Sequence, residues 1–436
     1  MLTLASEGEL RLERARLPAC LLAEDTGAPV DADGLAVVDI EIRGGVMAAV
    51  LPAAPRGSGG VDLAGRMVWP SPVDMHTHLD KAHIWPRAAN PDGSFAAALA
   101  TVQQDAANWQ APDLRRRMDF ALRSAFANGT AAVRTHLDSI PPQGTITWPV
   151  FAELRQSWAG RVALQGVALA LPESWRGGEG RALAGLVAEH GGSLGSFPLM
   201  TPELDADLDV LFGLALDLGL ELDFHVDETG DPAARSLRHI ALAALRHRFP
   251  HRIVCGHCCS LARQSEDEVR RTLDLVAEAG ISVVGLPMCN MYLQDRAPGR
   301  TPRWRGVTLA HEIRARGIPF AVASDNCRDP FYAYGDLDMH EVFREAVRIL
   351  HLDHPLAGWP AVVTSAPAHI IGLPRCGRIG PGLPADLVIF EGRRWSEVLS
   401  RPESRRTVLR AGRPIDTTPP DYAELDDLFA RSLGPP

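Results

Sequence analysis

The middle of the chain alternates short apolar segments with amphipathic ones, and this alternation constrains the fold more than any other feature. Helical patterns at 112–127 and 262–279 are each followed by a glycine, a common helix stop. Eight apolar segments lie between such patterns and are predicted strands: 67–75, 130–136, 162–170, 193–200, 220–226, 252–258, 281–288 and 319–325. Eight strand–helix units predict a (β/α)8 barrel of the TIM type, an α/β fold.

The two ends of the chain have a different pattern. Residues 35–52 alternate apolar and polar side chains around Gly44 and Gly45, which indicates a hairpin. Further strand patterns occur at 385–390 and 407–415. We therefore predict that residues 67–370 form the barrel, whereas residues 1–66 and 371–436 form a small composite β-sandwich in which the two ends share a sheet.

Composition limits the partners of the chain. A formal charge of -10 and a pI near 5.8 argue against nucleic acid or an anionic membrane as the main partner. Seven cysteines without a regular spacing suggest reduced thiols. The sequence contains no run of eighteen apolar residues and does not begin with a secretory pattern. We expect a cytoplasmic protein that acts on a small molecule and binds neither membrane nor nucleic acid.

Ligand-capable side chains recur at the ends of the predicted strands. His76 and His78 lie two apart, so both point to the same face of their strand. Such a pair alone is more often hydrogen-bonded or solvated than a metal site. It gains weight because His225, His257 and Asp325 end three other strands, and the ends of barrel strands converge on one rim.

Three imidazoles and one carboxylate leave a coordination position for water, as in catalytic metal sites. A divalent ion there lowers the pKa of that water towards neutrality. Glu228 follows His225 by three residues, and its carboxyl group could move protons between nucleophile and substrate. The alternative is a solvated loop acid. His136 ends another strand, and is either a neighbour of the ligands or an ordinary core histidine.

The segment Cys255-Gly-His-Cys258 invites comparison with another class of zinc deaminases, which use a P-C-x-x-C motif. Here Val254 stands in place of the proline, and residues three apart on a strand face opposite sides. We therefore interpret these cysteines as buried, inert thiols.

Taken together, these motifs resemble the amidohydrolase superfamily, and more narrowly its cytosine deaminase branch. The segment PVDMHTHLDK (72–81) resembles the superfamily's first-strand motif, and residues 377–390 resemble its return into the composite β domain. The narrower similarity rests on segments 133–138 (VRTHLD), 225–228 (HVDE), 290–296, 301–308 and 324–335, together with His257.

The resemblance implies one divalent metal, zinc or iron, held by His76, His78, His225 and Asp325. A single ion is implied because SFPLM (196–200) lacks the lysine that bridges two metals in binuclear relatives. The resemblance also implies a homo-oligomer. It assigns catalytic roles as follows: a proton shuttle for Glu228, contact with nucleophile and substrate for His257, and a second proton acceptor in Asp325.

Three positions depart from the bacterial cytosine deaminase pattern and bear on the substrate. Asn326 replaces the second acid of an Asp-Asp pair, and Phe331 replaces a tryptophan. The glutamine that binds the pyrimidine has no clear counterpart. Leu171 and Glu173 are the two candidates, and we choose Glu173. These changes favour hydrolysis of cytosine or a 5-substituted cytosine such as 5-methylcytosine, with release of ammonia.

Two other functions stay open at this point. The same scaffold supports s-triazine and N-alkyl amide amidohydrolases. Some amidohydrolase-like proteins are non-catalytic assembly proteins that have lost metal ligands, although this chain keeps all four candidates.

Overall fold

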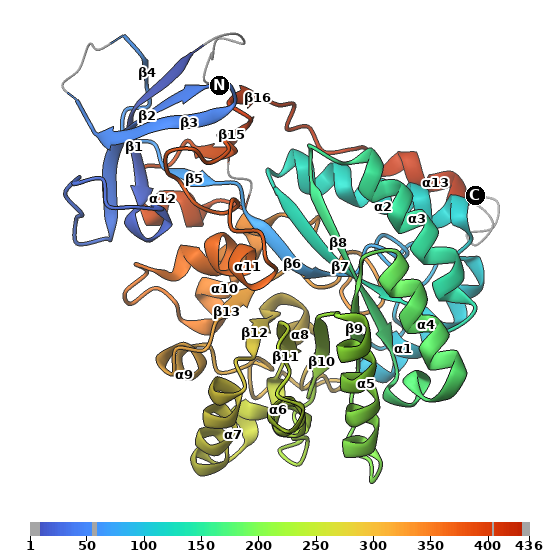
Figure 1. Cartoon of the computed structure of the whole chain (residues 1–436). Coiled ribbons are helices and arrows are strands. Elements are labelled where there is room, and N and C mark those ends of the chain that lie inside the picture. The colour runs from blue at the N-terminus through green and yellow to red at the C-terminus, as the bar shows by residue number, and fades with distance from the viewer. Residues whose placement is uncertain (1–8, 55–58, 403–404, 430–436) are drawn as a thin grey trace. The chain divides into compact units, whose positions relative to one another are not determined.

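The computed structural model describes residues 9–54, 59–402 and 405–429. Its central element is an eight-stranded sheet whose strands follow one another in chain order from β6 to β13 (Figure 1). Thr77 forms a parallel bridge with Asp325, and its hydroxyl donates to the carbonyl oxygen of Asp325 at 2.7 Å. The first and last strands are thereby joined, so the predicted barrel is confirmed.

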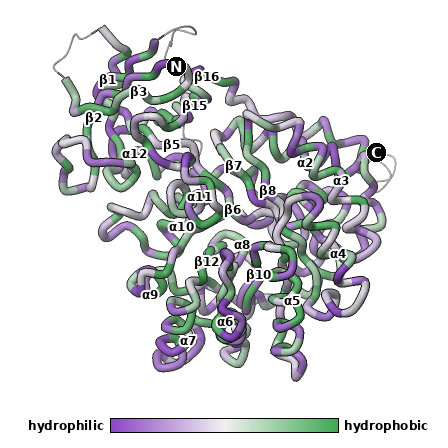
Figure 2. The backbone as a smooth tube through the Cα atoms, viewed as in Figure 1, coloured by the Kyte–Doolittle hydropathy of each residue, from purple (hydrophilic) through white to green (hydrophobic). Residues whose placement is uncertain are grey.

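The eight strands of the barrel are short and mostly buried, as expected of strands covered on both faces, and hydrophobic residues alternate with buried polar ones along several of them (Figure 2). They are β6 (Val73–Thr77), β7 (Ala132–Asp138), β8 (Ala163–Ala170), β9 (Ser193–Ser196), β10 (Leu222–Val226), β11 (Ile253–His257), β12 (Ser282–Gly285) and β13 (Phe320–Val322).

Helices follow the strands, and several begin and end where the sequence signals them. Ser94 and Ser265 cap their helices by accepting a hydrogen bond from the backbone three residues on, and Gly219 ends another in the left-handed region. The helices after β6 are α1 (Phe95–Asp105), α2 (Ala111–Ala127), α3 (Gln143–Ser157), α4 (Gly177–Glu189), α5 (Leu204–Leu218), α6 (Ser236–His247), α7 (Glu266–Glu278), α8 (Pro287–Leu293), α9 (Ala310–Ala315), α10 (Met339–Leu350), α11 (Ser365–Ile370) and α12 (Trp395–Ser400).

The first predicted barrel strand, 67–75, is divided between two sheets. β5 (Val68–Pro70) pairs antiparallel with β14 (Leu387–Phe390), whereas β6 enters the barrel. Pro70 and Pro72 lack the backbone N–H that a continuous ladder needs, so the segment changes partner between them.

The ends of the chain form two four-stranded sheets rather than the one shared sheet that the sequence suggested. The N-terminal strands pair among themselves, and both edges of β14 are taken by β5 and β15. The strands are β1 (Leu10–Pro18), β2 (Leu35–Arg43), β3 (Val46–Pro52) and β4 (Val61–Asp62) in one sheet, and β5, β14, β15 (Arg406–Arg410) and β16 (Arg413–Pro414) in the other.

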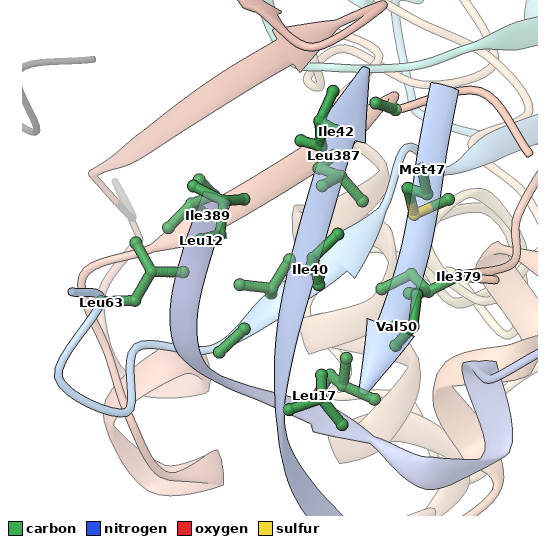
Figure 3. Packing of buried hydrophobic residues seen from close by; sticks show 14 of the residues in the cluster. Leu12, Leu17, Ile40, Ile42, Met47, Val50, Leu63, Ile379, Leu387 and Ile389 are labelled. Atoms are coloured by element: carbon green, nitrogen blue, oxygen red, sulfur yellow. The ribbon is translucent and has the colours of Figure 1, made fainter. Parts of the chain in front are cut away.

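The two terminal sheets contribute to one hydrophobic core (Figure 3). Leu12 and Ile40 from the first sheet belong to the same buried cluster as Leu387 and Ile389 from the second. Backbone hydrogen bonds such as Ala385 N to Gly45 O at 2.9 Å link the two ends of the chain. We call this cluster the composite β core.

The chain divides into two compact units. One contains residues up to 74, 123–132 and 338–419, and the other contains 75–122, 133–337 and 420 onward. This division groups α10 and α11 with the terminal strands, so the domain boundaries at residues 66 and 371 stay a prediction. Among the described residues, no helix is both long and apolar enough to span a bilayer.

The last described segment packs on helix α2 within the barrel unit, although the sequence placed 371–436 in the β-sandwich. This segment comprises η6 (Tyr422–Leu425) and α13 (Asp426–Phe429). Leu425 and Phe429 cluster with Phe120, and Arg116 pairs with Asp427 at 2.6 Å. Its apolar residues are too few to produce a clear sequence signal.

Candidate metal centre and active site

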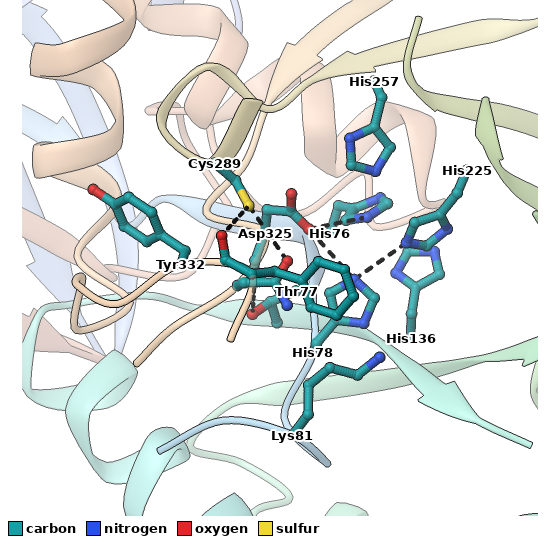
Figure 4. A network of polar contacts seen from close by, with 12 residues as sticks. His76, Thr77, His78, Lys81, His136, His225, His257, Cys289, Asp325 and Tyr332 are labelled. Atoms are coloured by element: carbon teal, nitrogen blue, oxygen red, sulfur yellow. Dashed lines mark hydrogen bonds and ion pairs between the residues drawn. The ribbon is translucent and has the colours of Figure 1, made fainter. Parts of the chain in front are cut away.

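The residues predicted to bind a metal meet at one end of the barrel. His76 lies in β6 and His225 in β10, whereas His78 and Asp325 follow the ends of β6 and β13. His257 ends β11. All five side chains are buried, and Figure 4 shows the imidazoles gathered beside Asp325. The carboxyl ends of barrel strands converge in this way because the strands are parallel.

Distances within the cluster match a shared cation. The Nε2 atoms of His78 and His225 are 3.1 Å apart. Asp325 Oδ1 lies 3.3 Å from His78 Nε2 and 3.6 Å from His76 Nε2. Donor atoms bound to one ion approach one another to about this separation.

A fourth imidazole belongs to the same group. The ring nitrogens of His76, His78, His136 and His225 lie within 4.8 Å of one another, and His76, His257 and Asp325 form a second such group. The His136 ring centroid is 3.9 Å from that of His76. His136 Nε2 also lies 3.3 Å from Asp223 Oδ1, so this histidine has a carboxylate neighbour of its own.

Burial keeps the four imidazoles of His76, His78, His225 and His257 neutral. It lowers the pKa of His76, His78 and His225 well below the usual value, and neighbouring charged groups lower it further. Burial, together with His136, lowers the pKa of His257 to about 3. Neutral imidazole offers the lone pair that a metal requires, so the cluster is in the protonation state that binds a cation.

The buried nitrogens also lack other partners. Neither ring nitrogen of His76 has a hydrogen-bond partner among the described residues. Buried polar atoms without partners are rare and costly, and a bound ion would satisfy them. Imidazole nitrogens with one carboxylate suit zinc or iron. The donor set therefore fits a divalent transition-metal ion.

Glu228 lies beside this cluster, with a side chain that is 5% exposed. Its Oε1 accepts a hydrogen bond from Asn290 Nδ2 at 3.0 Å and lies 3.5 Å from His257 Nδ1. Burial, and secondarily the charge of Asp325, raises the pKa of Glu228 well above its usual value. A carboxyl group with a raised pKa can both donate and accept a proton near neutral pH.

Asn290 belongs to the site, although the sequence marks it only as part of the segment 290–296. Its Nδ2 donates to both Glu228 and His257 Nδ1, the latter at 2.9 Å. Because the Nδ1 atom of His257 then accepts, the proton of this imidazole is on Nε2, which has no other partner among the described residues. No local pattern marks an asparagine for this task.

Lys81 is a second residue that the sequence left without a role. It is buried, and its Nζ lies 2.7 Å from Asp138 Oδ1. Its charge lowers the pKa of His78, so it is close to the metal-binding group.

The three residues predicted to bind substrate differ in placement. Asn326 is buried, donates to Asp329 Oδ2 at 2.7 Å and accepts from the Cys289 thiol at 3.5 Å. Phe331 lies in the same loop, with its ring centroid 5.8 Å from Lys81 Nζ. Glu173 is exposed in η3 (Pro172–Trp175), and no described contact joins it to the histidines. Its role stays a prediction.

The cysteines of the C-x-x-C segment are free and buried. Burial raises the pKa of the Cys255 and Cys258 thiols well above the usual value, so they are protonated and unreactive. Neither belongs to a potential metal-binding group of the described residues.

Comparisons with known proteins bear on the family and the fold of the chain. Residues 190–416 match the model of the amidohydrolase family. Over 423 residues, the chain is 56% identical to a pterin deaminase of Rhizobium rhizogenes strain K84, covering 96% of each protein. It is 23% identical to an N-isopropylammelide isopropyl amidohydrolase of Pseudomonas sp. strain ADP, covering 81% of this chain and 87% of that one.

Solved structures share the fold. A 5-methylcytosine deaminase from Klebsiella pneumoniae with 5-fluorocytosine superposes with a TM-score of 0.80 at 23% identity, covering 93% of this chain and 97% of that one. A zinc-bound adenosine deaminase from Xanthomonas campestris superposes with a TM-score of 0.68 at 20% identity, covering 97% and 96%.

Proposed function

The chain belongs to the amidohydrolase family, and from this premise we propose that it is a metal-dependent hydrolytic deaminase whose substrate is a pterin. The observation that carries the substrate class is the 56% identity with a pterin deaminase over 96% of both chains. Cytosine and 5-methylcytosine, favoured by the sequence motifs, are the second candidate.

Both candidates contain the same reacting unit. A ring carbon carries an amino group and is bonded to a ring nitrogen, at C2 of a pterin and at C4 of cytosine. Hydrolysis adds water across this C=N unit and breaks the bond to the amino group. A pterin and water thus give the 2,4-dioxo pteridine and ammonia.

His76, His78, His225 and Asp325 would hold one divalent ion, zinc or iron. Such an ion supplies Lewis acidity that lowers the pKa of a water molecule towards neutrality. This assignment is supported by the neutral imidazoles, and by the two His76 ring nitrogens, which have no hydrogen-bond partner in the described part of the chain. We also propose His136 as a positioning residue, because its ring packs against that of His76 and its Nε2 lies 3.3 Å from Asp223 Oδ1.

Glu228 moves the protons. It accepts one from the attacking water, gives it to the ring nitrogen, and later delivers a proton to the departing amino group. Asn290 fixes its carboxyl group from one side. Nε2–H of His257 donates to the oxygen that adds to the ring carbon. Asp325 accepts the second proton of the water, and this is the proton that Glu228 then delivers to the departing amino group, which leaves as ammonia.

The test compares ammonia release from pterin, cytosine, 5-methylcytosine and an amino-s-triazine by purified protein with measured metal content. We expect kcat/KM for pterin to exceed that for cytosine by about 100-fold or more, because a site shaped for two rings leaves contacts unmade with one. A preference for cytosine or 5-methylcytosine over pterin would contradict the proposal and establish the second candidate. Loss of all activity on chelation, with recovery on adding zinc or iron, is expected in either case.

We further propose that the protein is a cytoplasmic homo-oligomer. Light scattering on the purified chain tests the assembly, and a monomer would contradict it.

A further inference from the structure

Three phenylalanines, Phe95, Phe197 and Phe331, form a contiguous cluster that we call the aromatic wall. Phe95 and Phe197 stack with centroids 5.9 Å apart and planes at 14°. Phe331 meets Phe95 edge-on, with centroids 5.4 Å apart. All three rings are only partly buried, so part of their surface is not covered by the described protein.

The origin of the rings places the wall across the mouth of the barrel. Phe197 directly follows β9, and Phe331 follows β13. These strands are four positions apart in the eight-stranded order, so they lie on opposite sides of the barrel. Phe95 begins α1, the first helix after β6. All three rings therefore belong to segments that follow the carboxyl ends of strands, and two segments from opposite sides meet in one cluster at the end of the barrel where the histidines lie.

The wall is held in place by hydrogen bonds. Asn90 Nδ2 donates to the carbonyl oxygens of Ser94 and Pro330, at 3.0 and 2.9 Å. These carbonyls belong to the residues immediately before Phe95 and Phe331. One buried amide therefore fixes the relative position of two of the three rings.

The aromatic wall also contacts the loop after β13, which carries Asp325 and Asn326 and which we call the metal-binding loop. The Cys289 thiol donates to Asn326 Oδ1 and to the carbonyl oxygen of Phe331, at 3.5 and 3.8 Å. Asn326 is the residue after Asp325. The ring of Phe331 faces Lys81, whose charge acts on His78 and His225.

We propose that Phe95 and Phe197 bind the second ring of a fused two-ring substrate and so determine that the enzyme prefers bicyclic over monocyclic substrates. This inference rests on the proposed function. With the reacting carbon of a pterin at the histidine cluster, its pyrazine ring extends away from the metal, and a flat aromatic ring stacks on an aromatic wall. Phe331, nearest the metal loop, contacts the reacting ring.

The test measures kcat/KM of wild type, Phe95→Ala and Phe197→Ala on two substrates, pterin and 2-amino-4-hydroxypyrimidine. The second compound has the same reacting ring as pterin but lacks the pyrazine ring. Stacking of a nucleobase on an aromatic side chain corresponds to roughly 10- to 100-fold in affinity. We expect each variant to lose about that factor on pterin and about twofold or less on the single ring. Phe197→Tyr, which keeps the ring, should restore the preference.

Tyr334→Ala is the matched control, because Tyr334 is another aromatic residue of the loop after β13 but is 63% exposed and lies outside the wall. This variant should leave the ratio of kcat/KM for pterin to kcat/KM for 2-amino-4-hydroxypyrimidine unchanged. If the Phe95 and Phe197 variants lose kcat/KM equally on both substrates, or lose none on pterin, these residues do not bind the second ring. Pterin would remain the substrate in that case. If the wild type accepts the single ring but not pterin, or neither compound, the proposed function fails and the wall fails with it.

Discussion

The composite β core and the histidine cluster are both buried, but they contain opposite kinds of side chain. The core consists of aliphatic groups such as Leu12, Ile40 and Leu387, whose burial stabilises the fold. The cluster places five imidazoles and Asp325 together, and several of the ring nitrogens have no hydrogen-bond partner within residues 9–54, 59–402 and 405–429. Such groups reduce stability unless a ligand satisfies them. The composite β core therefore stabilises the fold. The histidine cluster lowers the stability of the fold until a bound ion satisfies its buried nitrogens.

The largest expected effect is on catalysis by the cluster. Glu228→Gln keeps the size and the neutral form of the buried side chain but cannot transfer a proton. We expect kcat to fall by a factor on the order of 100 to 10,000, with metal content and Tm nearly unchanged. Steady-state rates, metal analysis and thermal melts measure the three quantities. A Gln variant that retains substantial activity would remove Glu228 from the mechanism.

The corresponding change in the composite β core affects stability instead. Leu387 is fully buried between its partners on β5 and β15, so Leu387→Ala leaves a cavity. The free energy of unfolding should fall by about 2–5 kcal/mol, measured by denaturant titration. At temperatures where the variant is folded, kcat should match the wild type. A large loss of kcat in a folded variant would break the contrast between the two regions.

Metal should stabilise the cluster and leave the composite β core unaffected. With free zinc at about 100 times its Kd, binding to the folded state alone adds about 2.7 kcal/mol. The metal-dependent increase in Tm should disappear in His225→Ala and persist in Leu387→Ala. If His225→Ala still gains stability from zinc, the assignment of His225 as a ligand is wrong.

A smaller effect is expected at Asn290, which holds Glu228 and His257 in position. Asn290→Ala should reduce kcat by about tenfold, because a hydrogen bond to a reacting group contributes about that factor. Asn290→Gln, which keeps the amide, should recover part of the rate. If the two variants have the same Tm, the difference between their rates comes from the position of Glu228 and His257 and not from a loss of folding.

A last expected effect, on stability rather than on rate, is a pH dependence at Asp329. Burial raises the pKa of this carboxyl from 3.8 to about 6, so its protonated form is favoured in the folded protein. Its contribution to stability is complete below about pH 4 and is lost as the pH rises through about 6. Asp329→Asn, which can still accept from the backbone of Phe331, should flatten the pH profile of unfolding in that window. If the variant instead shows a steeper loss of stability with rising pH, the predicted direction of the Asp329 effect is wrong.

Sequence patterns were sufficient for features that depend on local periodicity. Eight apolar segments predicted the barrel, and the period of two placed His76 and His78 on one face. The division of 67–75 was missed because apolar residues flank Pro70 and Pro72 on both sides, so a strand pattern does not show which sheet each half joins. Similarly, Glu173 was chosen by motif spacing, whereas its exposure depends on the path of the loop after β8.

Side chains that act through distant partners gave no local signal. Asn290 is 62 residues from Glu228 along the chain, and Asn90 is 240 residues from Pro330. Their roles arise only when several loops assemble at the barrel mouth. Tertiary contacts of this kind are decided by packing, and a single sequence does not encode them as a recognisable spacing.

The Cys289 thiol provides a way to observe how the metal-binding loop moves. It is 1% exposed and hydrogen-bonded to Asn326 and Phe331, so an alkylating reagent reaches it only when that loop separates from α8. The rate of alkylation therefore reports the frequency of local opening, in the way that amide hydrogen exchange does for the backbone. Mass spectrometry of the labelled peptide would distinguish this opening from global unfolding, which also exposes Cys255 and Cys258.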